Sequence, residues 1–345
     1  MEKPLATRRI AWIDNCKALA ISLVALGHLQ TVYLVNEVIF AFVLPVFFFL
    51  SGYTFSSSAN MPFGSMLRKK YRTLLIPYFG FSLILFAFWF FVRRNFGLSG
   101  HAADTSVTDA LLQILYGVNS EVFVTPLWFL TCLFVVEVFF WLLHRLRIKT
   151  AIAAVVLGLF VVGLYYWTLM DIRHFPHAFW NVDQACFYLF FFSAGFVAYG
   201  RNFVERACCS KRRSCTIAAV AVGVFALAFW TRDNSSATWM YLLMQALMCN
   251  GGLVVFVALV YLIPRNRILD FLGRNTLTVF ALHMMVQAVL IGATVSVFHM
   301  DVAYLHSSLW ICVLLTLITL VILVPAILFI NRFLPWLTGR RIVKQ

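Results

Sequence analysis

The first long apolar segment carries three side chains that could do chemistry inside a membrane, namely Asp14, Lys17 and His28. On a helix with 3.6 residues per turn, Asp14 and Lys17 are i,i+3 neighbours. His28 returns to the face of Lys17 after about three turns, ~16 Å along the axis. An imidazole ionises near neutral pH and needs no metal to act as a general base or a nucleophile. The spacing therefore predicts one helix face with a charged pair at one end and a reactive imidazole at the other.

Each of these residues also has a purely structural interpretation. Lys17 can extend to the membrane surface and pair with Asp14, and His28 can hydrogen-bond a neighbouring helix. A charged residue at mid-helix costs ~2.5–3.5 kcal/mol on insertion scales, so an ionisable group there needs a reason. That cost favours a functional His28, and Gly27 leaves room beside the imidazole for a neighbouring backbone or a substrate.

A second candidate is the basic cluster Arg68-Lys69-Lys70-Tyr71-Arg72, which has four bases in five residues. Such a cluster can hold the phosphates of a ligand. It can equally set the membrane topology or meet anionic lipid headgroups. The residues alone leave both interpretations open.

Three further polar positions lie in or beside apolar segments. Glu137 is near the middle of a predicted span, where it can form an interhelical hydrogen bond or take part in chemistry. His283 lies about two turns inside another span and could approach Lys17 or the basic cluster. Ser51-Gly52, near the end of the second span, allows close contact between helices.

The other histidines and the cysteines show no metal-ligand spacing. No CxxC pair occurs among the eight cysteines, and most of them lie in predicted helices, where a buried free thiol is ordinary. The sequence therefore predicts neither a disulfide framework nor a metal site. The histidines that we expect to be solvated in outer loops are His174, His177, His299 and His306.

These side chains must be positioned by helices that cross a membrane. Of the 345 residues, 63% are hydrophobic and 12% are charged, whereas soluble domains usually carry about 25% charged residues. Apolar blocks of 18 or more residues can cross a ~30 Å hydrocarbon layer as helices. The chain therefore predicts a single all-α domain over residues 1–345, a polytopic bundle of about ten transmembrane helices. The predicted spans are 12–34, 37–56, 73–93, 126–144, 150–170, 183–200, 214–231, 238–262, 276–298 and 307–330.

The charges set the orientation of this bundle. Of the 27 Lys and Arg residues, 22 fall at the two termini and in the even-numbered connections. Because positive loops stay in the cytoplasm, both termini are predicted to be cytoplasmic. The net charge of +14 is then a property of topology, because the bases lie in short clusters between apolar blocks, and this distribution argues against a nucleic-acid partner. The charged residues that interrupt the first segment argue against a cleavable signal peptide.

Six pieces of the chain form a family pattern when they are taken in order. They are Trp12-Ile13-Asp14 with Lys17 and Gly27-His28; Leu44-Pro45 through Phe47-Phe48-Phe49-Leu50-Ser51-Gly52-Tyr53; Lys69-x-x-Arg72 before Leu75-Ile76-Pro77-Tyr78; Leu127-Trp128-Phe129-Leu130; Phe191-Phe192-x-x-Gly195; and Leu272-Gly273-Arg274-Asn275 with His283. Together they resemble the membrane-bound acyltransferase 3 family, in particular its sugar O-acetyltransferase (fucose 4-O-acetylase-like) branch. The resemblance covers almost the whole chain.

The resemblance implies an O-acyltransferase that moves an acetyl or other short acyl group from cytoplasmic acyl-CoA to a hydroxyl of a cell-surface or lipid-linked carbohydrate. It implies acetyl-CoA as a co-substrate, with no permanently bound cofactor. His28 is then a general base or a transient acyl carrier, and Asp14 orients Lys17. The expected CoA-binding residues are Lys69, Arg72, Arg68 and Lys17. The expected substrate-binding residues are Trp128, Glu137, Ser51, Asn275 and His283.

The chain departs from the family pattern at two places. The family often has His-Met-Pro where this chain has Val43-Leu44-Pro45, so any function of that histidine is absent. Lys69 stands where an arginine is common, which weakens bidentate phosphate binding. We also expect no appended soluble domain, which by the resemblance marks a stand-alone enzyme. The resemblance further implies a location in the bacterial inner (plasma) membrane and a polysaccharide substrate such as an exopolysaccharide.

Two other functions stay open on the residues alone. A proton-coupled secondary transporter could use His28 and Glu137 as a proton relay and Lys17 to bind an anion. A glycolipid flippase would consume no thioester. Against the transporter stand the lack of an inverted internal repeat in the sequence and a basic cluster outside the predicted bundle.

Overall fold

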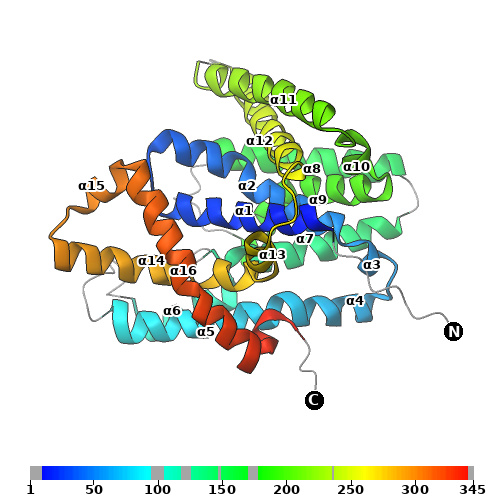
Figure 1. Cartoon of the computed structure of the whole chain (residues 1–345). Helices are drawn as coiled ribbons and strands as arrows, with labels where there is room; N and C mark the ends of the chain where they lie inside the picture. Colours follow the sequence, from blue (N-terminus) through cyan, green and yellow to red (C-terminus); the bar gives the residue numbers. More distant parts are fainter. Residues whose placement is uncertain are drawn as a thin grey trace.

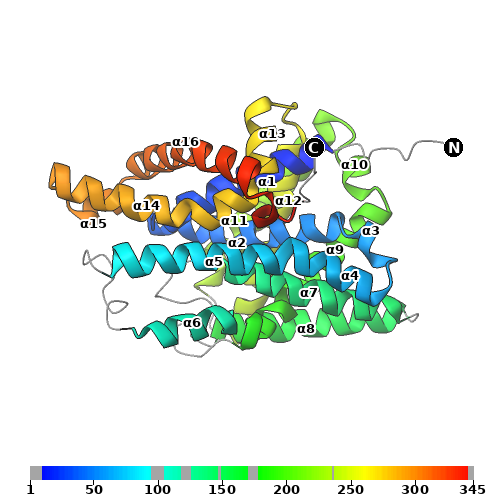
Figure 2. The same ribbon diagram turned by 90° about the horizontal axis from the view of Figure 1, so that it is seen from below.

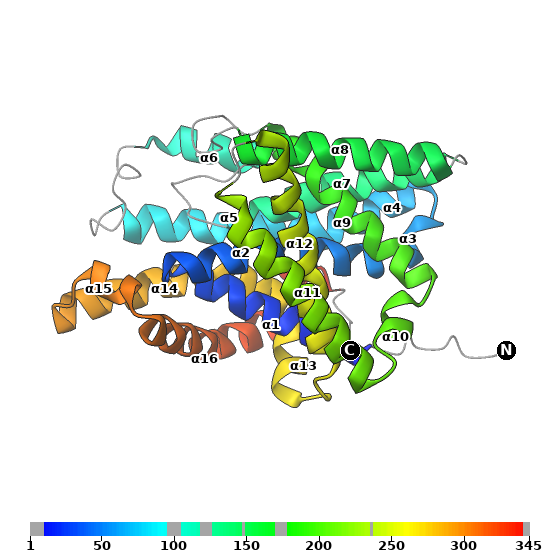
Figure 3. The ribbon, with the colours of Figure 1, turned by 90° about the horizontal axis from the view of Figure 1, so that it is seen from above.

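The computed structural model describes residues 10–94, 105–117, 126–146, 149–169, 178–234 and 237–340. Within these ranges every regular element is a helix, which agrees with the predicted all-α class. Most of the long helices run along one common direction, and the pair α11 (Lys211–Arg232) and α12 (Thr238–Tyr261) crosses them obliquely (Figures 1 and 3).

Within the described ranges, eight helical segments are long and apolar enough to cross a membrane, and each overlaps a predicted span. The eight are Tyr33–Tyr53 (α2), Phe63–Arg93, Trp128–Arg145 (α7), Phe179–Gly200, Lys211–Arg232 (α11), Thr238–Tyr261 (α12), Thr276–Val297 (in α14, Thr276–Phe298) and Leu309–Phe333 (α16). Helices α1 (Ala11–His28) and α8 (Lys149–Leu169) occupy the other two predicted spans. In α8 the described apolar stretch Ile152–Tyr165 is shorter than the eight spans, so the total of ten transmembrane helices stays a prediction. The orientation of the termini also stays a prediction.

Two helix boundaries differ from the predicted ones. Helix α1 ends at His28, six residues before the predicted end, and Gln30 just beyond it has a left-handed backbone (φ 49°). The predicted span 73–93 begins instead at Phe63, so the basic cluster lies on the helix α4 (Phe63–Lys70) and the π-helical turn η1 (Tyr71–Leu75), which continue into α5 (Ile76–Phe88). Lys, Arg, Leu and Met are strong helix formers, so this segment is helical in spite of its charges.

Helices α2 and α9 (Val182–Gly200) pack backbone to backbone at two glycines, Gly52 of α2 and Gly195 of α9. A methyl group at Gly52 would lie 1.9 Å from the Phe192 carbonyl oxygen, and one at Gly195 would lie 2.0 Å from the Phe49 carbonyl oxygen. Only glycine permits this approach, which is the small-residue packing typical of membrane helices. The two family-like pieces that contain these glycines therefore touch each other in the fold.

Helix α1 lies inside the bundle and packs against α2, α12, α13 (Arg267–Arg274), α14 and α16. Its residues Ala18, Ala20 and Ala25 are fully buried. The view from below shows α4 and α5 as one long rod, with α14 and α16 packed side by side above it (Figure 2). These contacts place α1 and α14 next to each other, which matters for the site.

Short helices complete the fold. They are α3 (Ser56–Ala59), α6 (Val107–Tyr116), η2 (Trp89–Arg93), η4 (Phe179–Asn181), α10 (Phe203–Ala207), α15 (Val302–Ser307) and η5 (Pro335–Thr338). Helix α6 is the longest of these short helices. Its start is capped by Ser106 Oγ, which accepts a hydrogen bond from the Asp109 N–H at 3.0 Å, and Tyr78 Oη donates to the Ile114 carbonyl at 2.7 Å.

Candidate active site

His28 is the last residue of α1, and its side chain is half-buried. Its Nδ1 lies 3.1 Å from the carbonyl oxygen of Val24, one turn earlier. Because a carbonyl oxygen can only accept, Nδ1 must carry the hydrogen and donate it. In the neutral imidazole Nε2 therefore holds a free lone pair, which is the form that a general base needs.

His283 lies beside His28 and has the same tautomer. The two ring centroids are 5.2 Å apart, with the ring planes at 69°. His283 Nδ1 lies 3.0 Å from the carbonyl oxygens of Val279 and Phe280, so it is the donor, and the buried Nε2 has no hydrogen-bond partner in the described structure. The sequence placed His283 near Lys17 or the basic cluster, whereas the structure brings it to His28.

A third polar residue fixes the spacing of the two histidines. Gln287, one turn after His283 on α14, donates from Nε2 to the Ala25 carbonyl of α1 at 2.7 Å, and its side chain is buried. Gln287 was not among the site residues predicted from the sequence. The sequence feature that could have indicated Gln287 is a single amide side chain in an apolar span, four residues after His283 and therefore on the same helix face.

The space beside Gly27 is occupied by Phe40. A methyl group at Gly27 would lie 2.8 Å from two carbons of the Phe40 ring, whose centroid is 5.5 Å from that of His28. The room expected there for a substrate or a backbone is thus filled by an aromatic side chain, which holds the imidazole of His28 from one side.

One expectation about the outer histidines is wrong. His306 is not a solvated loop residue, because it lies in α15 and its Nδ1 hydrogen-bonds the carbonyl of Leu29, the residue after His28. His299 is exposed, as expected. His174 and His177 lie outside the described residues.

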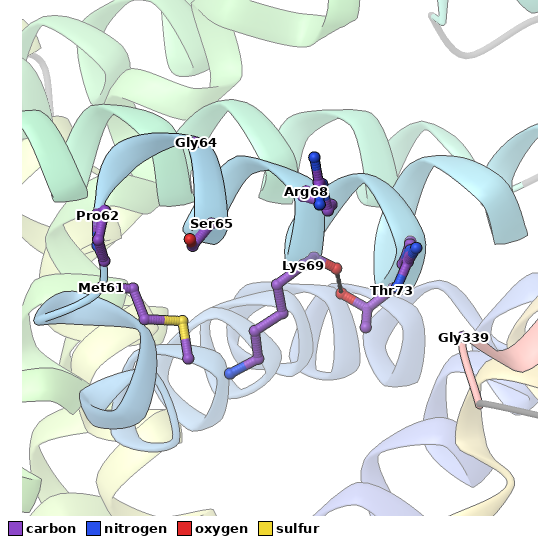
Figure 4. A pocket seen from close by; sticks show the side chains of 9 residues that line it. Met61, Pro62, Gly64, Ser65, Arg68, Lys69, Thr73 and Gly339 are labelled. Atoms are coloured by element: carbon purple, nitrogen blue, oxygen red, sulfur yellow. Dashed lines mark hydrogen bonds between the residues drawn. The ribbon is translucent and has the colours of Figure 1, made fainter.

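Three of the four clustered bases line one hollow of about 560 Å³ (Figure 4). Its lining residues are Met61, Pro62, Gly64, Ser65, Arg68, Lys69, Arg72, Thr73 and Gly339. We call it the basic hollow. Arg68 and Arg72 are exposed, whereas Lys69 Nζ donates to Ser58 Oγ at 2.8 Å and to Ser57 Oγ at 3.2 Å. Three cations around one cavity form a site that a phosphorylated ligand could bind.

The fourth base points away from the hollow and into the bundle. Lys70 Nζ lies 2.7 Å from Glu137 Oε1, and the exposed fractions of the two side chains are 12% and 4%. The same ammonium lies 4.8 Å from the centroid of the Phe55 ring. Glu137 of α7, predicted to bind substrate, is therefore engaged in a buried ion pair that ties α7 to α4.

The walls of the basic hollow are held by two other parts of the chain. The Met61 carbonyl accepts hydrogen bonds from Trp141 Nε1 at 3.2 Å and from Arg145 Nη2 at 2.8 Å, both on α7. On the opposite side Gly339, with φ 68°, passes so close to the backbone of Thr73 that a methyl group there would lie 2.9 Å from its Cα.

Asn275, another predicted substrate residue, anchors this C-terminal segment. Its Oδ1 accepts from Asn331 Nδ2 at 2.9 Å and from Arg340 Nη2 at 3.4 Å, and its Nδ2 donates to the Phe271 carbonyl at 2.7 Å. Asn275 precedes α14, in which His283 comes eight residues later, about 12 Å along the axis at 1.5 Å per residue. Helix α14 thus leads from Asn275, which is hydrogen-bonded to the residue that follows Gly339 of the basic hollow, to the two histidines.

The remaining predicted residues lie in other contacts. Asp14 and Lys17 are half-buried near the start of α1, where a methyl group at Gly273 of α13 would lie 2.2 Å from the Asp14 carbonyl oxygen. Ser51 Oγ donates to the Phe47 carbonyl at 2.8 Å within α2, which runs on through Pro45. Trp128 begins α7, with its ring centroid 6.3 Å from that of Tyr188.

A second hollow, of about 490 Å³, is lined only by apolar side chains and glycine, among them Leu19, Phe42, Phe225 and Phe256. It offers no partner for a phosphate. Of these two hollows, the basic hollow is therefore the one that fits a polyanion. Among the described residues there is no group of three or more His, Cys, Asp or Glu that could hold a metal ion.

The chain matches the model of a known family. A family model described as an acyltransferase domain, that of acyltransferase family 3, matches residues 10–331, which contain both histidines and most of the basic hollow. No curated protein and no solved structure matches the chain.

Proposed function

The chain belongs to acyltransferase family 3, whose model matches residues 10–331, and on that premise we propose that it is a membrane O-acyltransferase for carbohydrates. It moves an acetyl or other short acyl group from acyl-CoA to a hydroxyl of a cell-surface or lipid-linked glycan. The observation that carries the proposal is the basic hollow, because three cations around one cavity fit the phosphates of CoA.

The thioester reaches His28 along the path from the basic hollow. CoA binds with its phosphates at Arg68, Lys69 and Arg72, and its flexible arm extends beside α14 toward the two histidines. Lys17, oriented by Asp14, completes the phosphate contacts at the start of α1. The donor comes from the cytoplasm, to which the termini and the basic connections belong in this proposal, and the membrane is a bacterial inner membrane.

His28 acts as the general base in this reaction. Its Nε2 lone pair takes the proton of the acceptor hydroxyl while the oxygen attacks the thioester carbonyl. The tetrahedral intermediate collapses, the C–S bond breaks, and the proton on His28 passes to the thiolate to give free CoA. The alternative order, in which Nε2 attacks the thioester first and carries the acyl group, uses the same atom. Trp128 offers a flat wall for the sugar or the adenine.

The buried ion pair with Lys70 counts against the transporter. A proton relay needs a carboxyl group that can exchange its proton, whereas Glu137 is held 2.7 Å from an ammonium. Two observations count against the flippase. A flippase needs no site for a cytoplasmic polyanion such as CoA, and the matching family model describes an acyltransferase domain.

The test of this function is purified protein with labelled acetyl-CoA and a panel of sugar acceptors. We expect CoA release that depends on the acceptor, and a labelled ester on the sugar. His28→Ala should lower turnover by at least about 100-fold, the usual contribution of a general base, without loss of membrane insertion or thermal stability. Uptake of a solute into vesicles without thioester consumption, or near-normal turnover by His28→Ala, would contradict the proposal. Mass spectrometry of surface glycans from cells with and without the gene identifies the acceptor.

A further inference from the structure

The short helix α6 ends among side-chain donors from three other elements. The last carbonyls of a helix have no partner within the helix, and at a protein surface water usually satisfies them. Here donors from α5, α7 and η4 bond the carbonyls of Ile114, Leu115 and Gly117. The bonds are those of Tyr78 Oη to Ile114 at 2.7 Å, Trp180 Nε1 to Leu115 at 3.1 Å, and Asn181 Nδ2 and Thr131 Oγ1 to Gly117 at 2.7 and 2.9 Å.

Two of these donors come from a strained turn. Trp180 and Asn181 have φ values of 52° and 56°, in the left-handed region that residues other than glycine rarely adopt. Both side chains donate to the end of α6 from this turn. A helix end that is satisfied by protein donors, one pair of them held under strain, fits a place that water does not reach.

The level of this end in the bundle follows from α5. Tyr78, which donates to Ile114, is the middle residue of the 31-residue span Phe63–Arg93. Ala110, nearer the start of α6, packs in one buried cluster with Trp89 near the end of that span. Helix α6 therefore runs antiparallel to α5, along the half of the span that ends at Arg93, and Figure 2 shows the two helices side by side.

Helix α7 leaves room for α6 in the same crossing. With 18 residues it is the shortest of the eight spans found in the described ranges, and ~27 Å at ~1.5 Å per residue falls short of a ~30 Å hydrocarbon layer. Thr131, which bonds Gly117, belongs to the first turn of α7. The end of α6 thus meets the beginning of α7 inside the bundle.

The outer face of α6 is apolar. Ala110 and Ile114 are buried, and Asp109, the one charged residue in the sequence of α6, lies in its first turn. Five large apolar side chains are 37–58% exposed, namely Val107, Leu111, Leu112, Leu115 and Tyr116. Side chains in the middle of the transmembrane helix α16 are similarly exposed, for example Leu314 at 56% and Leu317 at 55%.

We propose that α6 is a membrane-inserted half-helix whose exposed face is covered by the acyl chains of the bilayer. It enters at the end of the bundle where Arg93 lies and penetrates to the level of Tyr78. There α7 continues the crossing to Arg145, so the two helices form one interrupted span. Hydrocarbon offers no partner for a carbonyl, which explains the four donors at the end of α6. Because Thr131 Oγ1 also lies 2.8 Å from the carbonyl of Trp128, this proposed substrate residue stands at the junction inside the membrane.

Spin labels on the exposed face test the proposal in vesicles of phosphatidylethanolamine and phosphatidylglycerol. Leu112→Cys and Leu115→Cys carry the label in a background in which the exposed Cys209 and Cys215 are serine. Oxygen concentrates in hydrocarbon and a water-soluble nickel complex is excluded from it. The ratio of oxygen to nickel collision rates at both sites should match that of Val321→Cys, a control on the exposed face of α16, and exceed that of Arg212→Cys, an exposed control at the start of α11, several-fold.

Two results would overturn the proposal. Nickel collisions as frequent as at Arg212→Cys would place α6 in water, and labels shielded from both reagents would mean that protein, such as a second copy of the chain, covers this face.

A second measurement uses the native chain. A phospholipid with a diazirine at the end of an acyl chain is illuminated in the same vesicles, and mass spectrometry should find its adduct on Val107–Tyr116 as well as on Leu309–Phe333. Adducts on the second segment without any on the first would refute the insertion of α6. Neither measurement uses acyl-CoA, so the proposal stands or falls independently of the enzymatic function.

Discussion

At the residue scale, the chemistry depends on which nitrogen of each histidine faces its own helix. In both His28 and His283, Nδ1 donates to a backbone carbonyl three or four residues earlier, which leaves Nε2 as the acceptor. The backbone thus sets the tautomer that a carboxylate sets in many enzymes. Side chains on a helix lean toward its N-terminus, so both rings tilt toward the ends of α1 and α14 that the proposal places in the cytoplasm.

The type of these residues was readable from the sequence, and their partners were not. An imidazole and a basic cluster are conspicuous in a chain with 12% charged residues. The contact between His28 and His283 joins residues 255 positions apart, and helix periodicity gives no information about which faces of two distant helices meet. The same limit applies to His306 and to the ion pair of Lys70 with Glu137.

Arg72 allows a test of the basic hollow at this scale. Arg72→Ala removes a cation from the proposed phosphate site, so the KM for acyl-CoA should rise about 10- to 100-fold, the equivalent of one charge-assisted hydrogen bond, with little change in the KM for the sugar. Arg201→Ala, an exposed base on another connection, is the control and should change neither constant. Steady-state kinetics decide, and equal rises in both KM values would reduce Arg72 to a topology signal.

At the element scale, the fold brings the site together through close helix contacts. The helices were predictable because their apolar blocks are long, and the errors lie at their ends. The segment 63–72 fell in the predicted connection between the spans 37–56 and 73–93, yet it is helical and carries three bases on one side and Lys70 on the other. A π-helical turn at Arg72 shifts the register there, which residue spacing did not reveal.

The crossing of α2 and α9 predicts a stability effect. A methyl group at Gly52 or Gly195 would lie 2.0 Å or less from a backbone oxygen, so Gly52→Ala and Gly195→Ala must push the two helices apart. We expect each to lower the unfolding free energy by about 1–3 kcal/mol, as overpacking does. Thermal unfolding in detergent measures this. Gly223→Ala, where a methyl group meets nothing within 4 Å, is the control, and equal behaviour of all three variants would refute the tight crossing.

The ion pair between α4 and α7 predicts a second stability effect. Lys70→Met or Glu137→Leu leaves the other charge buried and unpaired, which should destabilise the protein by about 3–5 kcal/mol. The double variant removes both charges and should recover most of that loss. Chemical unfolding of the three variants tests this, and additive losses in the double variant would show that the two side chains do not act as a pair.

At the scale of the whole molecule, the two parts of the site lie at different levels of the bundle. The basic hollow is built by α4, η1 and the segment after α16, and the histidine pair by α1 and α14. Asn275, bonded to Asn331 and Arg340, joins them through the start of α14. Composition and charge predicted a membrane bundle with most of its bases on the cytoplasmic side. The contacts of Asn275 with residues more than 50 positions away could be seen only in the three-dimensional structure.

The central claim is that the thioester of CoA bound at the basic hollow reaches the histidine pair. An acyl-CoA with a photoreactive group on its short acyl chain tests this directly and requires no knowledge of the sugar. After illumination, mass spectrometry should find the label on Ala11–His28 or Thr276–Phe298, and both excess CoA and Arg72→Ala should reduce it. Label confined to the oblique pair α11 and α12, or label that excess CoA does not displace, would contradict the claim.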